Sequence, residues 1–190
     1  MHKNLFTCLG LLALLSFRPP APEAQRPAPP AWFLEHLQEQ MQHGGLSVAD
    51  NSDYQSPQEP AEAYAVQWRW GPGQKSLFGR LYAIEAGQAQ ADAWQLRSFW
   101  HPGKHQAMVQ QFGADGSYAE GHLLPLKEGG TQLEQTFFAP DGSERRVRHE
   151  NSAIVDGEHA GTSFKRVGEE WQPERSYIWL LPESPGPEQD

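Results

Sequence analysis

Short turn-forming segments of one to three residues recur along the chain, and they constrain the fold more than any other feature of the sequence. They separate segments in which apolar and polar residues alternate, and they are Gly71-Pro72-Gly73, Pro102-Gly103, Asp115-Gly116, Gly129-Gly130, Asp141-Gly142, Asp156-Gly157 and Gly168. Asp-Gly between two such segments is a strong hairpin signal, because a type I′ turn needs positive φ at both central positions. The pattern therefore predicts antiparallel strands joined by short turns.

The segments between these turns have the two-residue period of strands. In the first, Tyr64, Val66, Trp68 and Trp70 share one face. Counted in this way the chain has eight or nine strands: Glu62 to Trp70, Leu77 to Glu85, Ala93 to His101, Gln106 to Phe112, Ser117 to Leu124, Gln132 to Phe138, Ser143 to Glu150, His159 to Arg166, and Arg175 to Leu181. No candidate crossover helix lies among them, which argues against a parallel α/β sheet. A meander of this length protects its edges most simply by closing into a barrel.

One helix is expected before the strands. The apolar residues Trp32, Phe33, Leu34, Leu37 and Met41 gather on one side, and Gly44-Gly45 supplies a stop. His36 and His43 lie nearer its polar side and are expected at the surface. The predicted class is all-β, with one N-terminal helix packed across a mouth or side of the barrel. This layout, from about Trp32 to Leu181, resembles the calycin (lipocalin-like) architecture and small exported bacterial proteins of that shape with no assigned activity. The Gly-x-Trp signature of typical lipocalins is absent, so the resemblance assigns no functional residues.

The ends of the chain indicate export. His2 and Lys3 precede an apolar run from Leu5 to Phe17, which is typical of a signal peptide. We expect a signal peptide over 1–24, a Pro-rich spacer over 25–30, the barrel over 31–181 and a disordered tail over 182–190. The protein would be periplasmic or secreted, or tethered if the proline-crowded site near Ala24 is not cleaved. The single cysteine, Cys8, lies inside the apolar run, so a cleaved protein has neither disulfide nor thiol chemistry.

Charge and motifs exclude several classes of function. The net charge of −9 argues against nucleic acid as a partner, because such binding depends on Lys and Arg. Phosphate-binding loops and the nucleophile elbow are absent, and no cofactor is expected. His101 and His105 flank a turn and could begin a metal site, but a third ligand is needed, and solvated residues at a hairpin tip are the preferred interpretation. No metal site and no catalytic residue are assigned.

The alternation also places polar residues inside the barrel. Over Ser143 to Glu150 one face is wholly charged and should meet water, so the other face should point inward. The same argument applies to two further strands. The candidate ligand-binding residues are Arg80, Tyr82, Gln135, Arg145 and His149. The alternative is that the charged ones lie at the open ends of the barrel and extend to solvent.

An eight-stranded barrel is just wide enough to be filled by side chains or to hold one small ligand, and seven Trp, nine Phe and five Tyr suit either. We expect a non-enzymatic binder of a small apolar or amphipathic ligand, with the oligomeric state open. One alternative is an enzyme in which His149 is a general acid or base and Arg145 or Arg80 stabilises an anion. The other is a structural or interaction module associated with the cell envelope.

Overall fold

The computed structural model describes residues 28–182. The expected signal peptide, the first half of the spacer and nearly all of the expected tail lie outside these residues. The described elements are α1 (Ala31–Gln40), η1 (Gln42–Gly45), β1 (Leu46–Asp50), η2 (Ser52–Tyr54), β2 (Ala63–Trp70), η3 (Pro72–Gln74), β3 (Ser76–Glu85), β4 (Gln88–His101), β5 (Gln106–Gly113), β6 (Tyr118–Pro125), β7 (Thr131–Phe138), β8 (Glu144–Asn151), β9 (Glu158–Val167) and β10 (Glu170–Leu180). Within residues 28–182, no helix is both long and apolar enough to cross a membrane.

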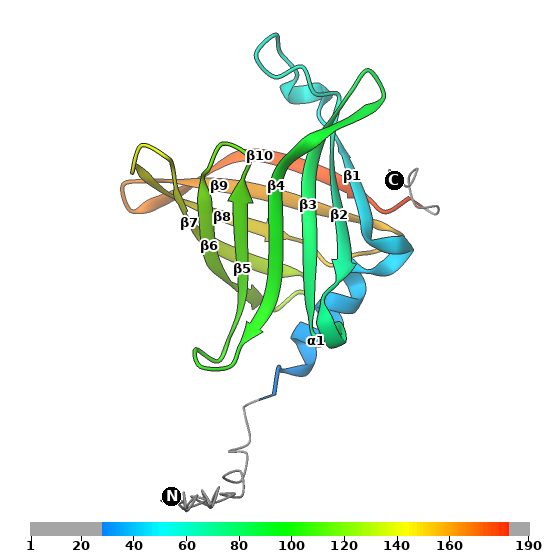
Figure 1. Cartoon of the computed structure of the whole chain (residues 1–190), viewed down its shortest axis with the longest axis vertical. Coiled ribbons are helices and arrows are strands. Elements are labelled where there is room, and N and C mark those ends of the chain that lie inside the picture. Colours follow the sequence, from blue (N-terminus) through cyan, green and yellow to red (C-terminus); the bar gives the residue numbers. More distant parts are fainter. Residues whose placement is uncertain (1–27, 183–190) are drawn as a thin grey trace, which may run out of the picture.

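The strands form a closed barrel in which every neighbouring pair is antiparallel (Figure 1). From β2 to β10 each strand pairs with the next in sequence, so the expected all-β meander that closes into a barrel is confirmed. The turn signals and the alternation had located nine of the strands. The tenth is β1, which completes the ring by pairing with β2 along its whole length and with β10 at Val48 and Ala49.

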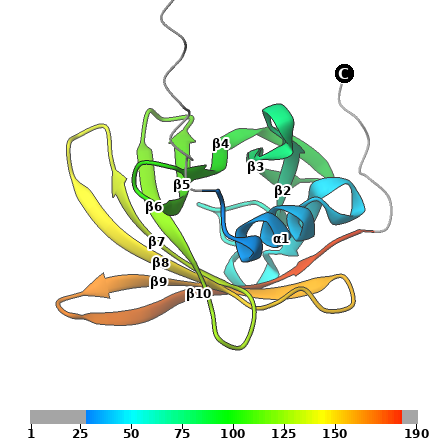
Figure 2. The ribbon, with the colours of Figure 1, turned by 90° about the horizontal axis from the view of Figure 1, so that it is seen from below.

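The helix α1 closes one end of the barrel. Figure 2 looks along the barrel from that end and shows α1 inside the ring of strands. Phe33 and Leu37 are fully buried, and they belong to a core cluster with residues of β3, β5, β6 and β7. The strand residues of that cluster are Leu77, Ala107, Val109, Leu123 and Leu133. The packing of these two large apolar side chains therefore anchors the helix in the barrel.

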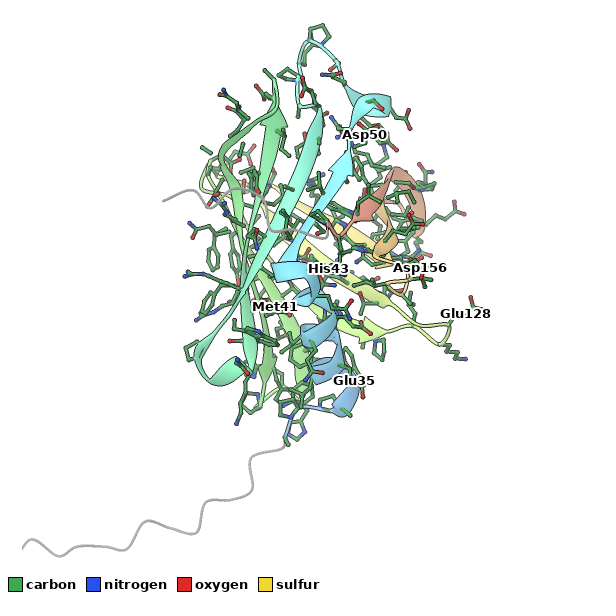
Figure 3. The ribbon with its side chains drawn as sticks, turned by 90° about the vertical axis from the view of Figure 1, so that its right-hand side faces the viewer. Glu35, Met41, His43, Asp50, Glu128 and Asp156 are labelled. Carbon is green, nitrogen blue, oxygen red and sulfur yellow. The ribbon has the colours of Figure 1, made fainter. Side chains whose placement is uncertain are left out.

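A tight glycine turn carries the chain from α1 into the barrel wall. Figure 3 shows it passing from Met41 and His43 into β1, which ends at Asp50 far from Glu35. Gly45 has φ of 78°, and a Cβ there would lie 2.6 Å from the carbonyl oxygen of Trp68, so only glycine fits. Because β1 runs away from α1, the loop that follows it lies at the opposite end of the barrel.

Candidate functional site

The barrel interior contains a cavity of about 310 Å³, at the lower end of the range of small-molecule sites. All ten strands and α1 contribute to its wall. The wall consists of His36, Gln40, Ser47, Val66, Trp68, Leu77, Leu81, Leu96, Ser98, Val109, Gln111, Leu123, Thr131, Leu133, His149, Asn151, His159, Gly161, Thr162, Ser163, Tyr177 and Trp179. The interior is thus partly hollow, and the hollow is where we place the candidate site.

The wall of the cavity has two chemically different sides. Strands β2 to β7 supply its aliphatic residues, among them Leu77, Leu96 and Leu123, and we call this side the apolar arc. Strands β8 to β10 and β1, together with α1, supply most of its polar residues, and we call that side the polar arc. The members of the polar arc are His36, Gln40, Ser47, His149, Asn151, His159, Thr162, Ser163 and Tyr177. Since strands that are neighbours in the ring are also neighbours in space, the two sides face each other across the cavity.

Three histidines of the polar arc are uncharged at neutral pH. The pKa of His36 is lowered to about 4, mainly by burial and in addition by repulsion from His159 when that ring is protonated. Burial, aided by Arg145, likewise lowers the pKa of His149 to about 4. Burial also lowers the pKa of His159, whose ring stacks on Trp179 with 6.4 Å between centroids. A neutral imidazole offers one hydrogen-bond donor and one acceptor, so these rings are polar but carry no charge.

Two of these rings have hydrogen-bonding capacity that the described part of the chain does not use. Nε2 of His149 and Nδ1 of His159 are buried and have no hydrogen-bond partner among residues 28–182. Buried polar atoms are nearly always paired, because an unmade hydrogen bond costs the free energy of desolvation. Both residues also line the cavity, so a bound molecule can supply the partner.

The sequence placed His149 and Gln135 inside the barrel, and both lie there. His149 is in the cavity wall. Gln135 is 3% exposed and accepts a hydrogen bond from Nε2 of Gln111 at 2.7 Å, which places it behind a wall residue. The inward face of β8 could be predicted because its opposite face carries only charged residues.

Arg145 shares the inward face of β8 with His149 but lies outside the cavity. Its guanidinium is 5.0 Å from the ring centroid of Phe137, in a separate pocket of about 220 Å³ that Trp94 also lines. The stacking on Phe137 keeps the charge near the end of the barrel away from α1. The alternative that placed Arg145 near an open end therefore describes it better than a position beside His149.

The expectation that Arg80 and Tyr82 point inward is wrong. Leu81 lines the cavity, so its neighbours on β3 lie on the outer face. There Tyr82 packs with Leu46 and Ala65, and the Arg80 guanidinium covers the Tyr82 ring at 4.7 Å. The alternation could not decide this strand because both of its faces are largely apolar.

Several members of the polar arc were not predicted from the sequence, and one of them, His36, was predicted at the surface. His36 lines the cavity instead, whereas His43 is exposed as expected. The buried positions 33 and 37 bracket His36 at helical spacing, and this spacing was the signal that could have found it. His159 and Tyr177 gave no comparable signal, because β9 and β10 carry polar residues on both faces.

A hydrogen-bonded network fastens the β1–β2 loop, residues 51–62, to β10. Glu59 forms a two-pronged ion pair with Arg175, with 2.6 Å between Oε2 and Nη2, and accepts a hydrogen bond from the Tyr64 hydroxyl at 2.7 Å. The Tyr177 hydroxyl donates to Oδ1 of Asn51 at 2.9 Å. The hydrogen bonds from Arg175 lower the pKa of Glu59 to about 2. Because Tyr177 also lines the cavity, this network borders the end of the site away from α1.

The polar arc is not arranged as a nucleophile and base. Ser163 is opposite His149 in the β8–β9 register, but its hydroxyl donates to the carbonyl oxygen of Arg175 at 3.4 Å. Activation of a serine needs a hydrogen bond from its hydroxyl to the base. At the hairpin tip, Nδ1 of His101 accepts a hydrogen bond from the Lys104 amide at 3.1 Å. In the described residues, no three His, Cys, Asp or Glu side chains are grouped to hold a metal ion.

Comparison with protein-family models and with curated proteins finds no match to this sequence. The geometry of the cavity is therefore the basis for proposing a function.

Proposed function

We propose that this barrel is a non-enzymatic binder of one small amphipathic molecule, held in the interior cavity. The observation that carries the proposal is the division of the cavity wall into an apolar and a polar arc. Export, suggested by the apolar run near the N-terminus, is part of the same proposal and would place the binder outside the cytoplasm.

The size of the cavity limits the ligand. At roughly 30 Å³ per water molecule in the liquid, a volume of about 310 Å³ corresponds to about ten water-sized groups. Each methylene buried against the apolar arc contributes about 0.8 kcal/mol of favourable transfer free energy. A chain or ring system of eight to ten carbon atoms would therefore fit the space, and its burial would offset the free-energy cost of association.

Binding is better supported than catalysis by the placement of the charged residues. An enzyme in which His149 acts beside an anion-stabilising arginine needs Arg145 or Arg80 in the same pocket. Arg145 stacks on Phe137 in another pocket, and Arg80 covers Tyr82 on the outer face. Neither guanidinium reaches the cavity wall that His149 helps to form.

A fluorescent probe can test for binding inside the barrel. 1-Aminonaphthalene has ten carbon atoms, is uncharged at neutral pH, and its emission shifts to shorter wavelength when it leaves water. Trp68 and Trp179 line the cavity, so a probe bound there should quench tryptophan emission by energy transfer. We expect saturable binding of one probe per chain.

Two adjacent leucines of β6 make a matched pair for locating the probe. Leu123 is 4% exposed and lines the cavity, whereas Leu124 is 43% exposed on the outer face. Leu123→Trp should place its larger ring in the cavity and weaken binding, and Leu124→Trp should leave binding unchanged. Equal binding by both variants, or no binding by the unmodified protein, would refute the proposal. If Leu123→Trp does not fold, Leu123→Phe makes the same test with a smaller side chain.

A further inference from the structure

We propose that the ligand is an uncharged molecule with a hydroxyl group at its polar end, and that this group lies against the unpartnered nitrogen of His149. The cavity would then discriminate against the carboxylate and ammonium analogues of the same molecule. This inference depends on the proposed binding function and specifies the chemical class of its ligand.

The first support is the complete lack of formal charge in the wall. None of the described residues that line the cavity is Asp, Glu, Lys or Arg. A charged group buried without a counter-charge loses its hydration and gains little in return. An anionic or cationic ligand would meet that cost here, and an uncharged one would not.

The second support is that two arginines near the end of the barrel away from α1 already have partners. Arg175 is paired with Glu59 through two hydrogen bonds at the far end of the cavity. Arg145 is stacked on Phe137 in its separate pocket. Moving either side chain toward a ligand would break these contacts, so neither is a ready counter-ion.

The third support is the state of the histidines themselves. Burial keeps the pKa of His149 near 4, so at pH 7 only about one imidazole in a thousand carries a proton. An anion would have to bring that proton in with it. A hydroxyl needs no such change, because it can donate to Nε2 of His149 if that nitrogen is unprotonated, or accept from it if it carries the proton.

The shape of the wall provides room for this group. Gly161 lies opposite Asn151 in the β8–β9 register and opposite Tyr177 in the β9–β10 register. A Cβ at Gly161 would lie 2.8 Å from Oδ1 of Asn151 and 3.0 Å from Nε1 of Trp179. The glycine therefore leaves these two polar atoms accessible at the cavity surface, and Asn151 lies two residues from His149 on the same face of β8.

The test compares three ligands that differ only at the polar end. 1-Decanol, decanoate and decylammonium are each used to displace 1-aminonaphthalene at pH 7.5, below the concentrations at which they form micelles. We expect 1-decanol to compete at a concentration at least about tenfold lower than either ion, a difference that corresponds to about 1.4 kcal/mol. Decanoate or decylammonium competing as well as 1-decanol would overturn the inference and leave the proposed function intact. If the probe itself does not bind, the proposed function fails and the inference fails with it.

Variants then locate the hydroxyl. His149→Leu removes the unpartnered nitrogen and should weaken 1-decanol binding about fivefold, the loss of one hydrogen bond, with little effect on the probe. His43→Leu, at an exposed histidine, is the matched control and should change neither. If His149→Leu does not fold, His149→Phe keeps a ring at the same position without its nitrogens and makes the same test. Unchanged 1-decanol binding in the folded variants would show that the hydroxyl lies elsewhere and would overturn the inference.

Discussion

Replacing Leu37 with alanine should strongly destabilise the protein, because this side chain anchors α1 in the barrel. Leu37 is fully buried in the core cluster, whereas Leu34, one turn earlier on the same helix, is 37% exposed. Leu34→Ala removes the same atoms from the same helix. The two variants therefore share any change in helix propensity and differ mainly in burial.

The expected magnitude follows from the surroundings of Leu37. Leu→Ala at a buried position costs about 2–5 kcal/mol, depending on how far the neighbours close the void. Leu77, Leu123 and Leu133 belong to the same cluster and also line the existing cavity, so the void would join open space instead of being filled. We expect a loss of about 3 kcal/mol for Leu37→Ala and less than about 0.5 kcal/mol for Leu34→Ala.

Urea titration at pH 7 measures both values, with tryptophan fluorescence and far-ultraviolet circular dichroism followed together. If α1 unfolds with the barrel, the two signals should coincide and the urea dependence of the unfolding free energy should be unchanged. Equal losses in the two variants, or a loss below about 1 kcal/mol for Leu37→Ala, would refute the argument that the helix is held by buried apolar contacts.

Two further predictions concern the loop network and the sheet. Glu59→Gln should cost about 1–2 kcal/mol at pH 7, a modest value because the Arg175 side chain is 36% exposed. The pKa of Glu59 is about 2 instead of 4.5, so its contribution to stability is fully present above pH 4.5 and is lost as the pH falls toward 2. In urea titrations across that range, the free energies of unfolding of the two proteins should converge. Gly121→Ala should cost about 3 kcal/mol or more in urea unfolding, because a Cβ there would lie 1.9 Å from the carbonyl oxygen of Glu134. A Cβ at Gly142 would meet no atom within 4 Å, so Gly142→Ala should cost only about 1 kcal/mol, through the positive φ of this residue. Similar losses of stability for the two glycine variants would contradict the steric explanation. A Glu59→Gln penalty that persists at pH 2 would contradict the ion-pair explanation.

Most of the barrel was predictable because each hairpin is encoded locally. Asp115-Gly116 and Asp141-Gly142 both adopt hairpin turns with positive φ at the glycine, and the alternation between turns sets the strands. The strand β1 was missed for a physical reason. It has only five residues, and the turn before it is read equally well as the end of α1. Its place in the sheet depends on pairing with β10, at the other end of the chain, and short-range patterns carry no such information.

Which way a strand faces was predictable only where its two faces differ. On β8 the charged outer face identified the inner one, and His149 was found. On β3 both faces carry large apolar residues, and arginine side chains cover aromatic rings on the outer face. Phe78, for example, has the guanidinium of Arg97 at 4.8 Å and that of Arg69 at 5.6 Å from its ring centroid. Aromatic residues under arginines look like core residues in a sequence, and only the register separates the two.

The polar arc opposes the stability of the free protein, and this gives a last prediction. A histidine with an unpartnered buried nitrogen destabilises the free protein by about 1–3 kcal/mol relative to an apolar residue of similar size. His149→Leu should therefore raise the free energy of unfolding by about 1 kcal/mol in urea at pH 7, while His122→Leu, on the outer face of β6, should leave it within about 0.5 kcal/mol. A variant that becomes more stable while it binds 1-decanol less tightly would show that the histidine is kept for the ligand. A loss of stability on His149→Leu would instead mean that the ring is a structural part of the core, and the case for a hydroxyl at this position would then fail.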